Sequence, residues 1–340
     1  MIPQHRPDAT ADLTAALHER VLVLDGAMGT MIQAYGLSEA DYRGERFADH
    51  GSDQQGNNDL LSLSQPDIIR EVHRKYLEAG ADLLETNTFN AQRISQADYA
   101  MTDLAYEMNF ESARLARLEC DAATEQTPDR PRYVAGAMGP LGIRIEPYGP
   151  TSHAEAREIF AEQMRALADG GADFFLLETF ADIAEIEQGI LAAREVDPSM
   201  PIIAQMTIGT DCLTPYGASA VDIAKALDAF GADVIGLNCS VGPQTILDAV
   251  EDMRKVTRKK ISAQPNAGMP REVGGRSMYM ASPEYMATYA AHLVRAGAAG
   301  FGDIARLALG AMVAPEIVVV ERLEILADGN HRRSRRIERD

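Results

Sequence analysis

The sequence predicts an α/β protein, a single (β/α)8 TIM barrel with an inserted lid-like loop after the first strand. Eight short apolar segments alternate with amphipathic helical patterns within the 340 residues, which favours a barrel over an open doubly wound sheet. The phrase Gly-Ala-Asp recurs at residues 80–82, 171–173 and 231–233, with a degenerate copy at 297–299. No Gly-x-Gly-x-x-Gly motif follows the first segment, which counts against a dinucleotide-binding fold.

The elements alternate in a regular order. Each Gly-Ala-Asp phrase ends a helical pattern and opens an apolar strand, and glycine there suits a left-handed helix terminus. The helix before residue 231 opens at Ser219, a good N-cap residue, and its apolar positions are spaced three and four apart. The predicted strands are Val21 to Leu24, Leu83 to Thr86, Tyr133 to Ala137, Phe174 to Leu177, Ile202 to Met206, Val234 to Leu237, Ile261 to Gln264 and a weak last one near Ala299 to Ile304.

Three segments lie outside this alternation. Residues 1–14 are expected to be an N-terminal extension, residues 15–325 the barrel, and residues 326–340 a basic C-terminal tail. The polar insert from Gln33 to Leu63 is expected to form an ordered lid or flap beside the mouth of the barrel. Its composition supports equally well a surface insertion without a role.

Charge and cysteine content restrict the function classes. The formal net charge of −19 argues against nucleic acid and anionic membranes as partners, because their phosphates would repel the chain. Only three cysteines are present, Cys120, Cys212 and Cys239, which suggests a reducing cytoplasm rather than a disulfide scaffold. The N-terminus has no apolar signal-peptide core, and the apolar run from Leu307 to Val320 is interrupted by proline and glutamate. We therefore expect a cytoplasmic protein.

Polar residues follow nearly every predicted strand. Because the carboxyl ends of parallel strands meet at one face of a barrel, these residues are expected to line a pocket for a small polar ligand. Asp25 and Glu178 are suited to hold an ammonium group, and the backbone amides of residues 26–30 a carboxylate. That combination would bind an amino acid.

Cys239 comes at the end of the sixth predicted strand, in the stretch Asp233-Val-Ile-Gly-Leu-Asn-Cys-Ser240. An isolated cysteine is most often a small buried hydrophobe. Here the polar neighbours and the strand-end position favour a nucleophilic or metal-binding thiol at the binding face.

Four motifs at the ends of predicted strands together resemble the homocysteine S-methyltransferase family, and the resemblance covers about residues 15 to 298. They read Asp25-Gly-Ala-Met-Gly-Thr, Glu85-Thr-Asn-Thr-Phe, Gly236-Leu-Asn-Cys and Gln264-Pro-Asn-Ala-Gly. The insert is similar to the homocysteine-binding module of cobalamin-dependent methionine synthase. The middle third resembles the methyltransferase half of bifunctional homocysteine methyltransferase/methylenetetrahydrofolate reductases.

The resemblance implies zinc-assisted methyl transfer to the homocysteine thiol, which forms methionine. It implies that Cys239 is the first of three zinc-binding cysteines and that Asn238 beside it is also catalytic. It implies a methyl donor, methylcobalamin or methyltetrahydrofolate, on a separate corrinoid or folate-binding protein. The substrate-binding residues it implies are Asp25, Gly26, Ala27, Met28, Gly29, Glu85, Asn87, Glu178 and Asn266.

The sequence departs from the family at the metal site. The family's other two zinc cysteines form a Gly-Gly-Cys-Cys-Gly motif, which would fall near Ile304 to Arg306 and is absent. Cys120 and Cys212 are not expected to replace them, and the nearest oxygen ligand is Asp303. We therefore expect weak or absent zinc and little methyltransferase activity.

Two alternatives remain open. One is a non-catalytic amino-acid-binding or scaffolding homologue that has lost the metal site. The other is a barrel lyase or aldolase of unrelated chemistry. No lysine follows a predicted strand, which counts against a Schiff-base mechanism.

Overall fold

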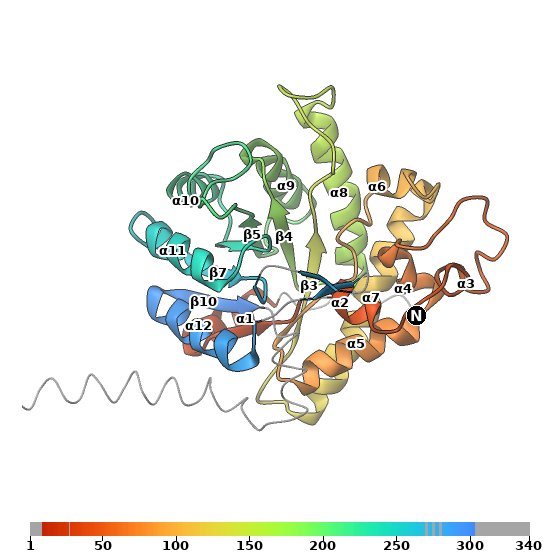
Figure 1. Cartoon of the computed structure of the whole chain (residues 1–340), viewed down its shortest axis with the longest axis horizontal. Coiled ribbons are helices and arrows are strands. Elements are labelled where there is room, and N and C mark those ends of the chain that lie inside the picture. The colour runs from red at the N-terminus through yellow and green to blue at the C-terminus, as the bar shows by residue number, and fades with distance from the viewer. Residues whose placement is uncertain (1–8, 27, 269–270, 274–275, 279–280, 303–340) are drawn as a thin grey trace, which may run out of the picture.

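A computed structural model describes residues 9–26, 28–268, 271–273, 276–278 and 281–302. Its helices and strands alternate along the chain, and helices surround a central sheet (Figure 1). In order they are α1 Thr10–Glu19, β1 Leu22–Leu24, α2 Met28–Gln33, α3 Glu39–Arg43, η1 Asn58–Leu60, α4 Leu61–Ser64, α5 Pro66–Glu78, β2 Leu83–Glu85, α6 Arg93–Ala97, η2 Thr102–Leu104, α7 Ala105–Gln126, β3 Tyr133–Met138, α8 His153–Gly170, β4 Phe174–Phe180, α9 Ile183–Val196, β5 Ile202–Met206, α10 Ala220–Ala229, β6 Val234–Asn238, α11 Pro243–Arg254, β7 Lys260–Gln264, β8 Arg271–Val273, β9 Arg276–Met278, α12 Pro283–Ala296 and β10 Ala298–Gly302.

Eight parallel strands close into a barrel in the order β1-β10-β7-β6-β5-β4-β3-β2, which confirms the predicted fold. Strands β8 and β9 form a separate antiparallel pair between β7 and α12. Each predicted strand coincides with an observed one to within a few residues. For the last strand the agreement extends to residue 302, because residues 303 and 304 lie outside the described residues.

The Gly-Ala-Asp phrase is both a helix end and a strand anchor. Gly171 and Gly297 adopt left-handed backbone with φ of 105° at their helix ends, as the phrase predicts. The aspartate has a second role that the sequence did not reveal. Asp173 donates its backbone N–H to the carbonyl of Val134 on β3 at 2.8 Å, and its carboxylate accepts the Val134 N–H at 2.7 Å.

An aspartate makes the same pair of hydrogen bonds to the preceding strand immediately before β2, β4 and β6. Asp82 holds Val23 of β1 in this way, and Asp233 holds Ile202 of β5. Each carboxylate also pairs with arginine: Arg20 and Arg130 for Asp82, Arg117 for Asp173 and Arg194 for Asp233. The fourth copy has Ala299 in place of the aspartate, and there the ladder between β10 and β7 shifts register.

Apolar side chains pack in two layers, one inside the barrel and one between strands and outer helices. The inner layer includes Leu22, Leu24 and Phe174, and Leu13 of α1 packs against it. Helix α1 therefore covers the amino end of the barrel, and the boundary expected between residues 14 and 15 falls inside this helix. The expected tail, residues 326–340, lies outside the described residues.

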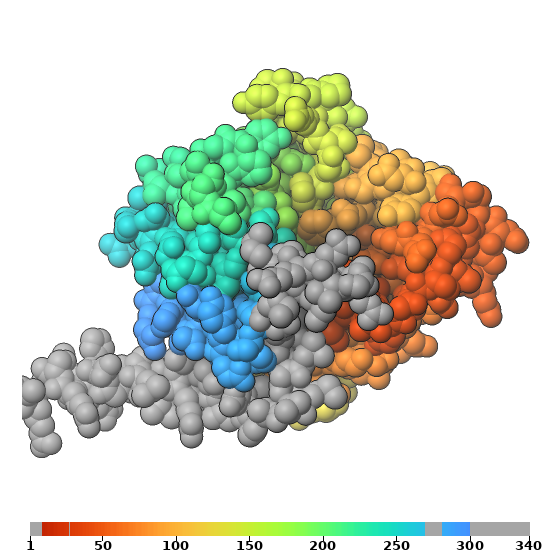
Figure 2. Space-filling view, viewed as in Figure 1, coloured from red at the N-terminus to blue at the C-terminus, as the bar shows by residue number. Residues whose placement is uncertain are grey.

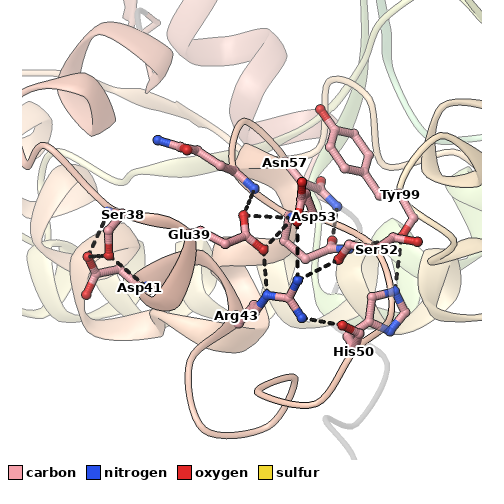
Figure 3. Close-up of polar contacts among 11 residues, drawn as sticks. Ser38, Glu39, Asp41, Arg43, His50, Ser52, Asp53, Asn57 and Tyr99 are labelled. Atoms are coloured by element: carbon pink, nitrogen blue, oxygen red, sulfur yellow. Dashed lines mark hydrogen bonds and ion pairs between the residues drawn. The ribbon is translucent and has the colours of Figure 1, made fainter.

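The insert after β1 is an ordered segment held by polar contacts (Figure 3). Arg43 is fixed between the carboxylate of Glu39 and the backbone carbonyls of His50 and Ser52. The Glu39 carboxylate also accepts backbone N–H groups at residues 54 and 55. Figure 2 shows this segment, in red and orange, forming one side of the molecule.

Contacts with the chain that follows β2 keep the insert beside the mouth. The Asn87 side chain donates to the carbonyl of Asn58 at 2.7 Å, and the backbone N–H of Asn90 donates to Asp59 at 3.0 Å.

Within the described ranges, no helix is both long enough and apolar enough to cross a membrane.

Candidate functional site

Three carboxyl groups meet at the carboxyl end of the barrel. Asp25 follows β1, Glu85 ends β2, and Glu178 lies near the end of β4. Asp25 is 1% exposed and accepts the backbone N–H of Glu85 at 2.8 Å. Glu85 is buried and Glu178 is partly buried. The barrel thus brings together three acidic groups that are widely separated in the sequence.

Two neutral amides contact these carboxylates from neighbouring strands. Gln264 at the end of β7 donates its Nε2–H to Glu85 Oε1 at 2.7 Å. Asn238 at the end of β6 donates its Nδ2–H to Glu178 Oε2 at 3.2 Å. The two amides belong to residues that pair directly across the β6–β7 ladder. They are therefore adjacent, and each contacts a different carboxylate.

Burial and mutual repulsion favour the protonated carboxyls. Burial raises the pKa of Asp25 well above its usual range, and the nearby Glu85 and Glu178 charges raise it further. Backbone hydrogen bonds from Glu85 and Gly26 act in the opposite direction. Burial also raises the pKa of Glu178, with a further contribution from Glu85. The cluster would be stabilised by a cation placed among its oxygens.

Left-handed backbone occurs at two strand ends of this mouth. Thr179 has φ 64°, and Cys239 and Ser240 each have φ 60°, a conformation that costs side-chain-bearing residues about 1 kcal/mol or more. Asn238 stabilises the first of these turns, because its Oδ1 accepts the Thr179 N–H at 2.7 Å and its Nδ2 donates to Thr179 Oγ1 at 2.8 Å. Strained backbone of this kind is concentrated at functional sites.

The described residues do not fit a zinc site of the kind the sequence resemblance implies. Cys239 is partly exposed at the mouth and its backbone N–H donates to the carbonyl of Gln264 at 2.9 Å. Cys120 is buried in α7, and Cys212 lies in the loop after β5. Within the described ranges, no group of three or more His, Cys, Asp or Glu residues is arranged to hold a metal ion. Asp303 and the positions near Ile304 to Arg306 lie outside the described residues.

The other predicted substrate-binding residues lie near the same mouth. The Asn87 amide contacts the insert rather than the carboxylate cluster. Asn266 follows β7 and its backbone N–H donates to the carbonyl of Val241 at 3.0 Å. Gly26 has φ 119°, and Met28 and Gly29 begin α2. Ala27 lies outside the described residues, so the expected carboxylate site at residues 26–30 stays a prediction.

Sequence reasoning missed two residues of the site. Gln264 was recognised as a strand-end residue, but its contact with Glu85 depends on the position of β7 relative to β2 across the barrel. The left-handed backbone of Thr179 was not predicted, because a threonine rarely adopts it. The Gln264-Pro-Asn-Ala-Gly motif was the available signal for the first.

Comparison with known proteins identifies a family and solved structures of similar fold. The family described as Homocysteine S-methyltransferase matches residues 22–303. The metallated form of the homocysteine methyltransferase MmuM from Escherichia coli is 23% identical, with a TM-score of 0.69 over 88% of this chain and 98% of that chain. Its apo form is also 23% identical, with a TM-score of 0.63 over 87% of this chain and 97% of that chain. These likenesses show a shared barrel fold.

Proposed function

Because the chain belongs to the homocysteine S-methyltransferase family, as the match over residues 22–303 shows, we propose that it binds homocysteine at the carboxyl end of its barrel for methyl transfer to the thiol. In that reaction the thiol loses its proton to solvent and the sulfur forms a bond to the methyl carbon, while the bond between methyl carbon and donor breaks and its electron pair stays with the donor, giving methionine. The donor would be methylcobalamin or methyltetrahydrofolate on a separate corrinoid or folate-binding protein.

The carboxylate cluster is the observation that carries this proposal. Asp25 and Glu178 have raised pKa values because they are buried close to another carboxyl, so an ammonium group would relieve both desolvation and repulsion. Charge-assisted hydrogen bonds are about twice as strong as neutral ones. We therefore assign the ammonium group of homocysteine to Asp25 and Glu178.

Calorimetric titration with homocysteine tests this assignment. The native protein should bind it, and Glu178→Gln should weaken binding about tenfold or more, because a hydrogen bond to a charged group contributes roughly 1.5–3 kcal/mol. Glu185→Gln is the matched control. Glu185 on α9 is also buried with its pKa raised to about 7, but it accepts the Leu141 N–H instead. Unchanged affinity in Glu178→Gln would contradict the assignment.

A non-catalytic amino-acid-binding protein is the second candidate. It is favoured by the cysteine content of the sequence. Apart from Cys239, the only cysteines are Cys120 and Cys212, and neither lies where the family has its second and third zinc ligands. Both candidates require homocysteine binding, so turnover separates them. Methionine formation from homocysteine and a methyl donor, lost in Cys239→Ser, would support the enzyme, whereas binding without turnover would support the second candidate.

A further inference from the structure

The carboxylate cluster contains more acidic groups than one substrate ammonium can neutralise. Asp25, Glu85 and Glu178 lie close enough to affect one another's ionisation. In the described part of the chain, no ion pair joins Asp25 or Glu178 to a lysine, arginine or histidine. Cys120 is another titratable group near Asp25, and burial raises its pKa far above its usual range, so it stays a neutral thiol. Burial and mutual repulsion both favour a proton on this cluster when no cation is bound.

Asn238 faces the cluster with its donor side, and its contacts fix that orientation. Its Oδ1 accepts a backbone N–H from Thr179, so its Nδ2 must be the atom directed at Glu178. Gln264 is directed the same way at Glu85, since only its Nε2 can donate to a carboxylate oxygen. An amide N–H favours the ionised form of the carboxylate that accepts it. Each amide therefore favours the ionised form of the glutamate that accepts its hydrogen bond.

We propose that the substrate ammonium enters this cluster in exchange for a proton, and that Gln264 and Asn238 are positioning residues that keep Glu85 and Glu178 ionised while the ammonium is bound. The inference rests on the proposed function. The proton leaves a carboxyl group of the cluster for solvent, and the ammonium group keeps its own protons and takes the vacated position. No bond between heavy atoms changes.

Methionine is the probe for the native protein, because it carries the same ammonium and carboxylate groups but has no thiol to lose a proton. Titrations at one pH in buffers of different ionisation enthalpy give the number of protons released on binding. We expect a release approaching one proton in acidic buffer that falls as the pH rises, since the empty cluster then loses its proton unaided. Binding without proton release at any pH overturns the exchange. Failure of both methionine and homocysteine to bind contradicts the proposed function itself.

Gln264→Met tests the positioning role. The methionine side chain introduced at position 264 fills a similar volume to glutamine but donates no hydrogen bond, so the cluster should retain its proton to higher pH. The midpoint of methionine affinity against pH should rise by about one unit, a tenfold change in proton affinity, with affinity recovering at high pH. An equal loss of affinity at every pH would indicate a purely structural role and would overturn the proposal.

Gln205→Met is the matched control. Gln205 is a buried glutamine on β5, which is separated from β7 by β6, and its Nε2 donates to Ser262 Oγ at 2.9 Å rather than to a carboxylate. The same glutamine-to-methionine change there should leave the pH midpoint in place. A midpoint that moves equally in both variants would contradict the role assigned to Gln264.

Discussion

Asp59 links the stability of the insert to pH through a single carboxyl group. It is buried in η1, and burial raises its pKa to about 6 although its carboxylate accepts the Asn90 N–H. The folded protein therefore binds this proton more tightly than the unfolded chain. The associated stability is fully present below the unfolded pKa, near 4, and is lost as pH rises through about 6.

We expect Asp59→Asn to raise the free energy of unfolding at neutral pH by at most about 3 kcal/mol, and to change it little near pH 4. The asparagine oxygen still accepts the Asn90 N–H, so only the charge is removed. Urea denaturation at several pH values measures the effect. Asp53→Asn is the control, because the Asp53 side chain is 96% exposed. An equal gain at both pH values would contradict this account of Asp59.

The positions of candidate site residues were predictable from sequence where strand ends alone determine them. Asp25, Glu178 and Cys239 follow strands whose apolar pattern was clear, so their common face could be predicted. The contact of Gln264 with Glu85 could not, since it depends on how side chains are directed across a closed barrel. The contact of Asn87 with Asn58 depends on the path of the insert, which has no periodic pattern.

The Gly-Ala-Asp phrase acts at the scale of whole elements. Its glycine ends a helix, and its aspartate fixes the register of the following strand against the strand before it. Sequence reasoning identified the first role because left-handed glycine is a local property. It missed the second, because the partner backbone belongs to another strand. The copy that lacks the aspartate opens β10, where the ladder is irregular.

Asp173→Ala should destabilise the fold strongly. Its side chain is 1% exposed, and the change leaves Arg117 without its closest partner and Val134 N–H without an acceptor. Breaking a buried pair in this way costs about 3–5 kcal/mol. Asp233→Ala, where the side chain is 48% exposed, should cost only about 1 kcal/mol. Equal losses in urea denaturation would contradict a role that depends on burial.

At the scale of the whole molecule, the number and alternation of apolar segments sufficed to predict the closed barrel. The cover provided by α1 was not predicted. That helix precedes the first strand, so no earlier strand marks it as part of the repeating pattern, and the expected boundary fell within it. The family and the barrel fold are established, whereas the metal content of the whole chain stays a prediction.

We expect metal analysis of the purified protein to find far less than one zinc per chain. Tight zinc sites combine several deprotonated ligands, and Cys239 is the only cysteine at the family's zinc positions in this sequence. Cys212→Ser serves as the control, because Cys212 is also a partly exposed thiol but lies in the loop after β5. Stoichiometric zinc that is lost in Cys239→Ser but retained in Cys212→Ser would show that other side chains complete a site there.

The central claim is that the mouth of the barrel binds the amino-acid end of homocysteine. A crystal structure of the protein soaked with homocysteine tests it most directly. We predict density for the amino acid with its ammonium nitrogen about 2.7–3.2 Å from oxygens of both Asp25 and Glu178. Homocysteine bound with its ammonium group away from these carboxylates, or bound at another part of the molecule, would contradict the claim.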